Sequence, residues 1–479
     1  MGIAETLEGS AIFRWYRQPI VQVSLLGFIF FCCPGLFNAI NGMGAGGLLD
    51  ENKAVVSNMN AVLNALFAIV GFMAGGINNV VGPRLTIFFS GWGYVIYIAA
   101  LYSYQIHFSS GFNIAAGAIL GICAGCIWAA QGALMMSYPT EQTKGRYISV
   151  FWSIFNWGGV IGSFVAFGIN YNAQRGGSVT SSTYVTFMIL MGIGTCCALL
   201  FVPPNLVRRA DGSPAVVIKY PNWKNEAIEI FKLVANKQLM LLFPMFWFSN
   251  WFYAYQFSTN GTFFNVRTRA LNSALYWMAQ IVGSIIFGLF LDTNRFNRRT
   301  RAFLGLAIVI VSFVAIFAGG TAWQATFDRK TFTDNTRIDF MDSGRSAGPI
   351  ICYLLYGLCD ALYQVYCYWL MGALTNDPLK LSRYAGFYKG VQSAGAAAAW
   401  AVNAAPNLSM MHELAINWAL LALSIPGALL VCRGVTDTNI GHEEYNLEAE
   451  KDKQLEAYPE DKIELPAEAA AETTDKPSH

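Results

Sequence analysis

Charged residues and histidines are scarce in this chain. Of its 479 residues only 13% are charged and four are histidines, whereas 55% are hydrophobic. So few polar residues cannot cover a soluble globule of this length. The histidines lie outside the apolar stretches, no Cys/His group has metal-ligand spacing, and the chain has no P-loop or nucleophile motif. We therefore expect no enzyme, metal site, cofactor or nucleic-acid partner.

Long apolar stretches take up most of the chain. Each contains roughly 20 or more mostly uncharged residues, enough for an α-helix to cross a hydrocarbon core of about 30 Å. The expected spans are 20–41, 54–77, 85–104, 112–136, 148–169, 183–203, 238–258, 272–291, 302–322, 347–373, 384–405 and 413–432. The hydrophilic, basic stretch 204–237 divides them six and six. The sequence thus predicts an all-α, multi-pass integral membrane protein of twelve transmembrane helices in two pseudo-symmetric six-helix bundles, 20–203 and 238–432.

The distribution of lysine and arginine predicts the orientation, because basic residues favour the cytoplasmic side of a membrane. With segment 1–19 in the cytoplasm, seventeen basic residues before the tail lie inside and eight lie outside. An even number of spans returns the carboxyl terminus to the same side. We expect both termini in the cytoplasm of a cell, with the plasma membrane and an internal membrane fitting equally well.

Hydrophilic segments outside the spans leave several alternatives open. Residues 221–237 space apolar side chains at helical intervals, which suits either an amphipathic helix on the inner face or a plain linker between the bundles. The outer loop 323–348 suits either a partner surface or a solvated cap. The acidic tail 433–479 is expected to be disordered. Asn260 and Asn407 fit a glycosylation pattern in predicted outer loops.

The two halves also resemble each other in sequence. Gly121, Arg146 and Gly158 recur in almost the same order and spacing as Gly357, Arg383 and Gly395. The fourth and fifth spans thus match the tenth and eleventh, which indicates an internal duplication.

Two cytoplasmic turns carry related motifs. Residues 75–84 contain Asn79 and Arg84, and residues 288–299 contain Asp292 and Arg295. Both resemble the loop motif of the major facilitator superfamily, in which an acid and basic residues form a gate contact on the inner face. The resemblance implies gating roles for these four residues, although the first copy has Asn79 where the acid belongs and the second spaces its arginines wider.

A more specific resemblance covers nearly all the spans. Residues 127–132 (IWAAQG), 357–364 (GLCDALYQ) and 383–390 (RYAGFYKG) together resemble the Unc-ninety-three-like branch of that superfamily, including uncharacterised fungal members. This implies a carrier fold of two bundles. The branch includes proteins proposed to regulate potassium channels or escort receptors as well as carriers, so the resemblance leaves the function open.

Asp360 is the most informative single residue. A carboxylate near the middle of span 347–373 costs roughly 2.5 kcal/mol or more unless it meets water, a partner or a proton. We therefore predict that Asp360 carries a proton or binds a cation, with Gln364 on the same helix flank. A structural hydrogen bond to a neighbouring helix is the alternative. Helix geometry argues against a direct pair with Lys389, which we expect to extend toward the inner headgroups.

Other amides inside spans are further candidates for solute or ion binding. Asn38 and Asn41 follow Pro34 in the first span, and Pro244 lies in the seventh, the matching span of the second half. Paired interruptions indicate a binding site near the midplane of a duplicated carrier. The remaining candidates are Gln131, Asn156 and Gln392. Helix-to-helix hydrogen bonding explains these amides equally well.

Two functions follow from these patterns. The first is a secondary transporter of a small solute or ion, working by alternating access and coupled to protons or cations through Asp360. The second is a membrane regulator or trafficking escort that presents the fold to a channel or receptor without transporting. For the transporter, Asp360→Asn should abolish coupling and leave the fold intact, whereas for the regulator changes in loop 323–348 or tail 433–479 should matter more.

Overall fold

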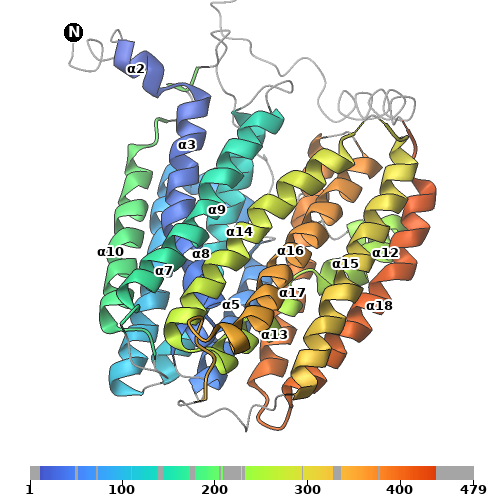
Figure 1. The fold of residues 1–479 in the computed structure, drawn as a ribbon. Helices are drawn as coiled ribbons and strands as arrows, with labels where there is room; N and C mark the ends of the chain where they lie inside the picture. The colour runs from blue at the N-terminus through green and yellow to red at the C-terminus, as the bar shows by residue number, and fades with distance from the viewer. Residues whose placement is uncertain are drawn as a thin grey trace, which may run out of the picture.

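The computed structural model describes residues 11–48, 52–71, 74–108, 110–138, 144–172, 178–203, 206–208, 228, 232–293, 295–326, 336–375 and 378–437. Long helices run side by side through the molecule, and the short helix α2 (Ala11–Tyr16) lies at one end of them (Figure 1). Apart from short turns, the described chain is helical. The predicted fold class is therefore confirmed at the level of an all-α membrane protein.

The helices of the first half of the chain, residues 11–208, begin with α2. After α2 they are α3 (Pro19–Phe30), the π-helical turn Phe31–Gly35, α4 (Leu36–Gly42), α5 (Lys53–Gly71), α6 (Ala74–Val81), α7 (Pro83–His107), α8 (Ser110–Ser137), α9 (Lys144–Ile169) and α10 (Ser181–Cys197). Those of the second half, residues 232–437, are α12 (Lys237–Phe248), α13 (Phe252–Phe263), α14 (Val266–Leu291), α15 (Arg298–Thr326), α16 (Ser343–Leu374), α17 (Pro378–Ala404) and α18 (Met410–Gly434).

In the described residues, most of each predicted span falls on these helices. In the described ranges, ten segments are long and apolar enough to cross a membrane. The two predicted spans outside those ten are 238–258, which is divided between α12 and α13, and 384–405, which lies in α17 and carries more polar residues. The chain is therefore a multi-pass integral membrane protein.

The first span and the seventh each contain a proline. Pro34 lies in the π-helical turn between α3 and α4. Proline has no backbone N–H, so it donates no helical hydrogen bond at this point. Pro244 lies inside α12, which ends four residues later and restarts as α13 after a short turn. The predicted interruptions are thus present.

The duplicated glycines make duplicated contacts. A Cβ at Gly121 would lie 2.4 Å from the carbonyl oxygen of Leu63 in α5, and one at Gly357 would lie 2.4 Å from that of Tyr276 in α14. Gly158 approaches the π-helical turn and Gly395 approaches α12 in the same way: a Cβ there would lie 2.4 Å and 2.2 Å from the carbonyl oxygens of Phe31 and Trp247. Both repeats need a glycine because backbone meets backbone at these crossings.

Each half of the chain has its own apolar core. One core is built almost wholly from residues 23–207 and the other from residues 239–435. The halves meet along two pairs of helices, α5 with α17 and α9 with α14. Buried polar groups concentrate along these contacts, as described below.

The structure corrects one prediction about loops. Asn260 lies inside α13, which continues five residues past the predicted span, and its side chain is fully buried. It donates to the carbonyl oxygens of Gly42 and Arg269, so a glycan has no room there. Asn407 is exposed in the turn between α17 and α18.

Parts of the other hydrophilic predictions lie outside the described residues. These are most of 209–231, residues 327–335 of the outer loop and the tail from 438 onward. The described part of the outer loop packs on the second half, because the Ile338 amide donates to the carbonyl oxygen of Phe263 at 2.8 Å. Residues 336–342 therefore cap the bundle end, as one of the two alternatives for this loop expected.

Candidate functional site

Asp360 is fully buried in α16 and is surrounded by neutral hydrogen-bond donors. Tyr253 of α13 donates to Oδ2 at 2.6 Å, and Gln364, one turn further along α16, donates to Oδ1 at 2.6 Å. Gln280 of α14 makes a third bond, to Oδ2. An ionised carboxylate has about four acceptor positions, so these donors satisfy most of its capacity without a cation.

Tyr276 of α14 links this carboxylate to a second buried amide. Its hydroxyl lies 2.8 Å from Oε1 of Gln256 and 3.3 Å from Oδ2 of Asp360. A phenol has only one proton to donate, so the shorter contact favours Gln256 and leaves the bond to Asp360 as the alternative. Tyr276 can thus change partner when the carboxyl group gains or loses a proton.

Two glutamines connect Asp360 to Lys389. Gln392 of α17 donates to Oε1 of Gln364 at 3.3 Å and accepts from Nζ of Lys389 at 2.8 Å. The predicted absence of a direct pair between Asp360 and Lys389 agrees with the ion pairs found in the described residues. The predicted extension of Lys389 toward the inner headgroups is wrong. Its ammonium turns toward Gln392, one turn further from the α2 end, because an amide oxygen and three aromatic rings receive it there.

Gln392 is the most connected of the predicted site residues. Its Nε2 lies within 3.0 Å of the side-chain oxygens of Ser249, Asn250 and Tyr388. Ser249 and Asn250 form the break between α12 and α13. The helix interruption predicted from Pro244 therefore contributes polar groups to the same network as Asp360.

The predicted residues of the first half divide into two groups. Asn41 is buried, and its Oδ1 accepts from Asn60 at 3.1 Å and from Tyr97 at 3.4 Å, which is a structural hydrogen-bond network within that half. Asn38, Gln131 and Asn156 are half-buried, and their side chains make no hydrogen bond in the part of the chain that the structure describes. Only this second group retains free polar groups for a solute.

The described side chains of the predicted gate residues form no ion pair with one another. Arg84, Asp292 and Arg295 are exposed, and none forms an ion pair within the described ranges. The side chain of Asn79 lies outside the described residues. Their gating role stays a prediction. At this end of the second half, Arg298 donates to the carbonyl oxygen of Gly372 at 2.7 Å and Arg301 to that of Leu291 at 2.6 Å.

A turn of the first half closes the end of the molecule remote from α2. Residues 44–47 all have positive φ, and a Cβ at Gly44 would lie 2.2 Å from the carbonyl oxygen of Phe257 in the second half. Arg269 of α14 is fully buried and donates to the carbonyl oxygens of Met43, Gly44 and Leu48 at 2.7, 2.6 and 3.0 Å. A buried guanidinium satisfied by carbonyls of the other half holds the two halves together at this end.

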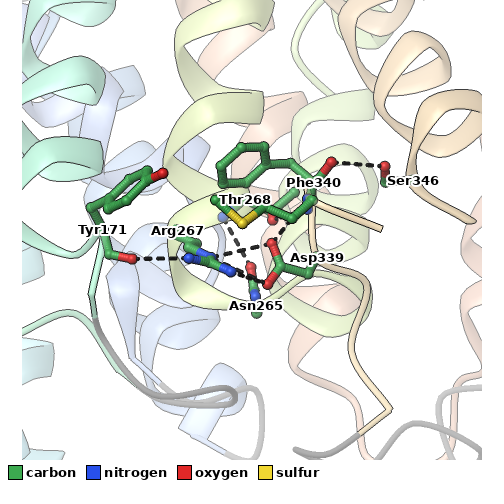
Figure 2. A network of polar contacts seen from close by, with 8 residues as sticks. Tyr171, Asn265, Arg267, Thr268, Asp339, Phe340 and Ser346 are labelled. Atoms are coloured by element: carbon green, nitrogen blue, oxygen red, sulfur yellow. Dashed lines mark hydrogen bonds and ion pairs between the residues drawn. The ribbon is translucent and has the colours of Figure 1, made fainter. Parts of the chain in front are cut away.

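A second arginine extends this closure toward the surface. Figure 2 shows Arg267 between Asp339 and the carbonyl oxygen of Tyr171. The ion pair with Asp339 is 2.5 Å long, and the bond to Tyr171 in the first half is 3.2 Å. Burial raises the pKa of Asp339, but the hydrogen bonds from Arg267 and the Met341 amide outweigh it, so the pKa lies below its ordinary value.

Sequence reasoning missed most partners of Asp360 and the whole closure. Tyr253, Tyr276, Gln256 and Gln280 belong to other helices, and single-helix periodicity does not show which helices meet. One signal was available for α14: Tyr276 and Gln280 are polar and one turn apart in an apolar span. For Arg269, the run of glycines at 44–47 was the available sign of an unusual backbone.

Comparison with known proteins decides the family. Residues 58–426 match the family model described as "Ion channel regulatory protein UNC-93". The chain belongs to the UNC-93 family. It is 44% identical to UNC93-like protein 1 of Arabidopsis thaliana over 87% of this chain and 91% of that protein. It is 42% identical to an UNC93-like protein of Schizosaccharomyces pombe over 88% and 82% of the two chains. The resemblance to the Unc-ninety-three-like branch, fungal members included, is confirmed.

Solved structures identify the fold of this UNC-93 family member. A D-xylose-proton symporter matches with a TM-score of 0.60 at 12% identity, over 90% of this chain and 99% of the symporter. A structure of proton-dependent oligopeptide transporters matches with a TM-score of 0.56 at 13% identity, over 87% and 98% of the chains. At such identities the match shows the major facilitator fold alone. Family and fold together indicate a membrane transporter or regulator rather than an enzyme.

Proposed function

We propose that this protein is a secondary transporter in which Asp360 binds the coupling proton or cation. The observation that carries the proposal is the carboxylate itself, which is fully buried and held by donors from α13, α14 and α16. An ionisable residue inside a membrane bundle is expensive and is found mainly on ion pathways. A donor set drawn from three helices makes the binding state of the carboxyl group sensitive to their relative positions.

The proposal includes a twelve-helix topology with two bundles, 20–203 and 238–432. α12 and α13 together form the seventh span, and α17 forms the eleventh. Both termini, the linker 204–237 and the tail 433–479 lie in the cytoplasm in this arrangement, as the basic residues favour. The end closed by Arg267 and Arg269 is then the outer end, so the conformation is closed to the outside.

In this mechanism the two bundles rock about a central site. The solute binds near Gln364 and Gln392 of the second half and the unpaired amides Asn38, Gln131 and Asn156 of the first. Opening toward the outside requires the hydrogen bonds of Arg269 to the turn 43–48 to break together. Asn79, Arg84, Asp292 and Arg295 would control the opposite end.

The test is the thermal stability of the purified full-length protein as a function of pH and ligand. Wild type, Asp360→Asn and the control Asp342→Asn, an exposed aspartate on the loop before α16, are compared with sodium, potassium and a panel of small metabolites. A ligand at about 100 times its dissociation constant stabilises the fold by roughly 2.7 kcal/mol. We expect wild type and control to show a ligand response that depends on pH, whereas the response of Asp360→Asn should not change with pH. Identical responses in all three proteins would refute the role of Asp360.

The family description favours a second candidate, a regulator or escort of another membrane protein. In that case Asp360 and its donors only hold α13, α14 and α16 together. Asp360→Asn would then leave capture of the partner unchanged, whereas alteration of loop 323–348 or removal of tail 433–479 would abolish it. Co-purification of membrane proteins with these three variants separates the two candidates.

A further inference from the structure

The surroundings of Lys389 leave its positive charge without an anion. Its ammonium donates to Oε1 of Gln392 at 2.8 Å and lies 5.9, 5.8 and 5.6 Å from the ring centres of Trp128, Tyr368 and Tyr388. An ammonium has three N–H donors, and in the described residues one of them has an oxygen acceptor. Taken as a whole residue, Lys389 is half-buried.

No acidic side chain is available to neutralise Lys389 by contact. The helices packed on α17 include α5, α12, α13 and α16, and Trp128 approaches from α8. Of these five helices only α16 contains an acidic residue, Asp360. The remaining titratable groups near Lys389 are Cys367, Tyr368 and Tyr388. Asp360 is separated from Lys389 by Gln364 and Gln392, and its own oxygens are occupied by other donors.

The first half places free polar groups one helical turn from two indole rings, one of which contacts this cation. Trp128 contacts Lys389 across the boundary between the halves, and Gln131 lies one turn further along α8. The ring of Trp152 lies 5.9 Å from that of Trp128, and Asn156 follows one turn along α9. Gln131 and Asn156 make no hydrogen bond in the described chain. A cation, two indoles and two amides therefore share one region of the interface.

We propose that Lys389 is the anion-binding group of the transport site and that the solute is a small organic monoanion. This inference rests on the proposed transport function and adds its substrate class. The single ammonium matches one negative charge, and the indole rings of Trp128 and Trp152 suit an apolar or aromatic body on the anion. Gln131 and Asn156 supply neutral donors for the remaining oxygens.

Charge balance then determines the coupling. With Asp360 ionised and Lys389 protonated, the empty site has no net charge. An arriving monoanion would leave one uncompensated negative charge in the membrane interior, which is costly. Asp360 removes that charge by taking up one proton. One proton therefore accompanies each anion, and transport responds to a pH gradient but not to membrane potential.

The experiment measures anion binding and proton uptake by the purified full-length protein. The probes are acetate, pyruvate, benzoate and nicotinate, each compared with its neutral amide, and the readouts are tryptophan fluorescence and a pH dye in weak buffer. We expect at least one anion to bind with uptake of about one proton, while the matched amide does not bind. Lys389→Gln should weaken that binding at least tenfold, and Lys389→Arg should retain part of it.

The outcomes distinguish the two proposals. Asp360→Asn should bind the anion without proton uptake, because its site already lacks the carboxylate charge. If no anion binds the wild type, or if Lys389→Gln binds as tightly as wild type, the anion site is refuted while the role of Asp360 stands. Equal proton uptake by wild type and Asp360→Asn would instead refute the transport mechanism. Thermal unfolding of every variant excludes misfolding as the cause, and Lys389→Arg gives a second reading if Lys389→Gln fails to fold.

Discussion

Asp360 accepts a hydrogen bond from Tyr253 of α13 at 2.6 Å. Two residues further along α13, Tyr255 makes a comparable hydrogen bond to a neutral group. Tyr255 donates to Oε1 of Gln324 at 3.2 Å. Tyr253→Phe removes a donor to a buried carboxylate and should cost roughly 1.5–3 kcal/mol, whereas Tyr255→Phe should cost about 0.5–1.5 kcal/mol. Thermal unfolding in detergent near pH 7 measures both. Equal losses would mean that Asp360 is uncharged in the folded protein.

At the scale of single residues, the sequence predicted Asp360 but not the side chains that surround it. Asp360 stood out because a carboxylate in an apolar span has a large transfer cost. Gln364 followed from helical spacing on the same span. The donors Tyr253 and Gln280 depend on how α13 and α14 pack against α16, which no local pattern contains. The direction of Lys389 was wrong for the same reason, since its aromatic neighbours include Trp128 from the other half.

At the scale of the elements, close packing depends on glycines at the points where two helices cross. In α17, a Cβ at Gly395 would lie 2.2 Å from the carbonyl oxygen of Trp247, whereas one at Gly386 would have no neighbour within 4 Å. Gly395→Ala must push α17 away from α12 and should destabilise the protein by roughly 1–3 kcal/mol. Gly386→Ala should stabilise it by up to about 1 kcal/mol, because alanine loses less backbone entropy in a helix.

Unfolding temperatures of the two alanine variants, measured side by side in one detergent, test this difference. A loss of stability in Gly386→Ala equal to that in Gly395→Ala would show that helix composition, rather than the crossing, sets the stability. The same measurement can be made on Gly158→Ala in α9, because a Cβ at Gly158 would lie 2.4 Å from the carbonyl oxygen of Phe31. Similar losses at both glycines would support the duplication inferred from sequence.

The positions of the helices were predicted more completely than the residues at which they begin and end. The apolar lengths located the ten segments that are long and apolar enough to cross a membrane, because a membrane helix has a minimum length. The extension of α13 through Asn260 was missed because its polar residues, which read as a loop, make hydrogen bonds with the first half. The break between α12 and α13 was anticipated from Pro244, whose ring cannot occupy a regular helix interior without loss of a hydrogen bond.

At the scale of the whole molecule, the polar contacts between the halves that the structure describes gather at the end remote from α2. Arg269 binds the turn 43–48, Tyr353 donates to the carbonyl oxygen of Gly42 at 2.8 Å, and Ser57 donates to Asn403 at 2.6 Å. These bonds must break together when that end opens, because they join the same two bodies. The closure is therefore cooperative, and weakening one contact should loosen its neighbours.

Asp339 offers the means to test this cooperativity. Its pKa is lowered in the folded protein, so the contribution of its pair with Arg267 is fully present above the ordinary aspartate pKa and is lost as the pH falls through the lowered value. At neutral pH the pair is intact. Asp339→Asn removes it, and we expect faster amide hydrogen exchange in residues 43–48 and 263–269 at pH 7.

Asp342→Asn is the matched control, because the pair of Asp342 with Arg345 is 3.8 Å long and both side chains are about half exposed, at 48% and 53%. Such a surface pair contributes little, so exchange in both segments should equal that of wild type. Wild type itself should reach the exchange pattern of Asp339→Asn only at a pH below the ordinary aspartate range. Unchanged exchange at 43–48 in Asp339→Asn would show that Arg269 holds the turn without help, and the closure would then consist of independent contacts.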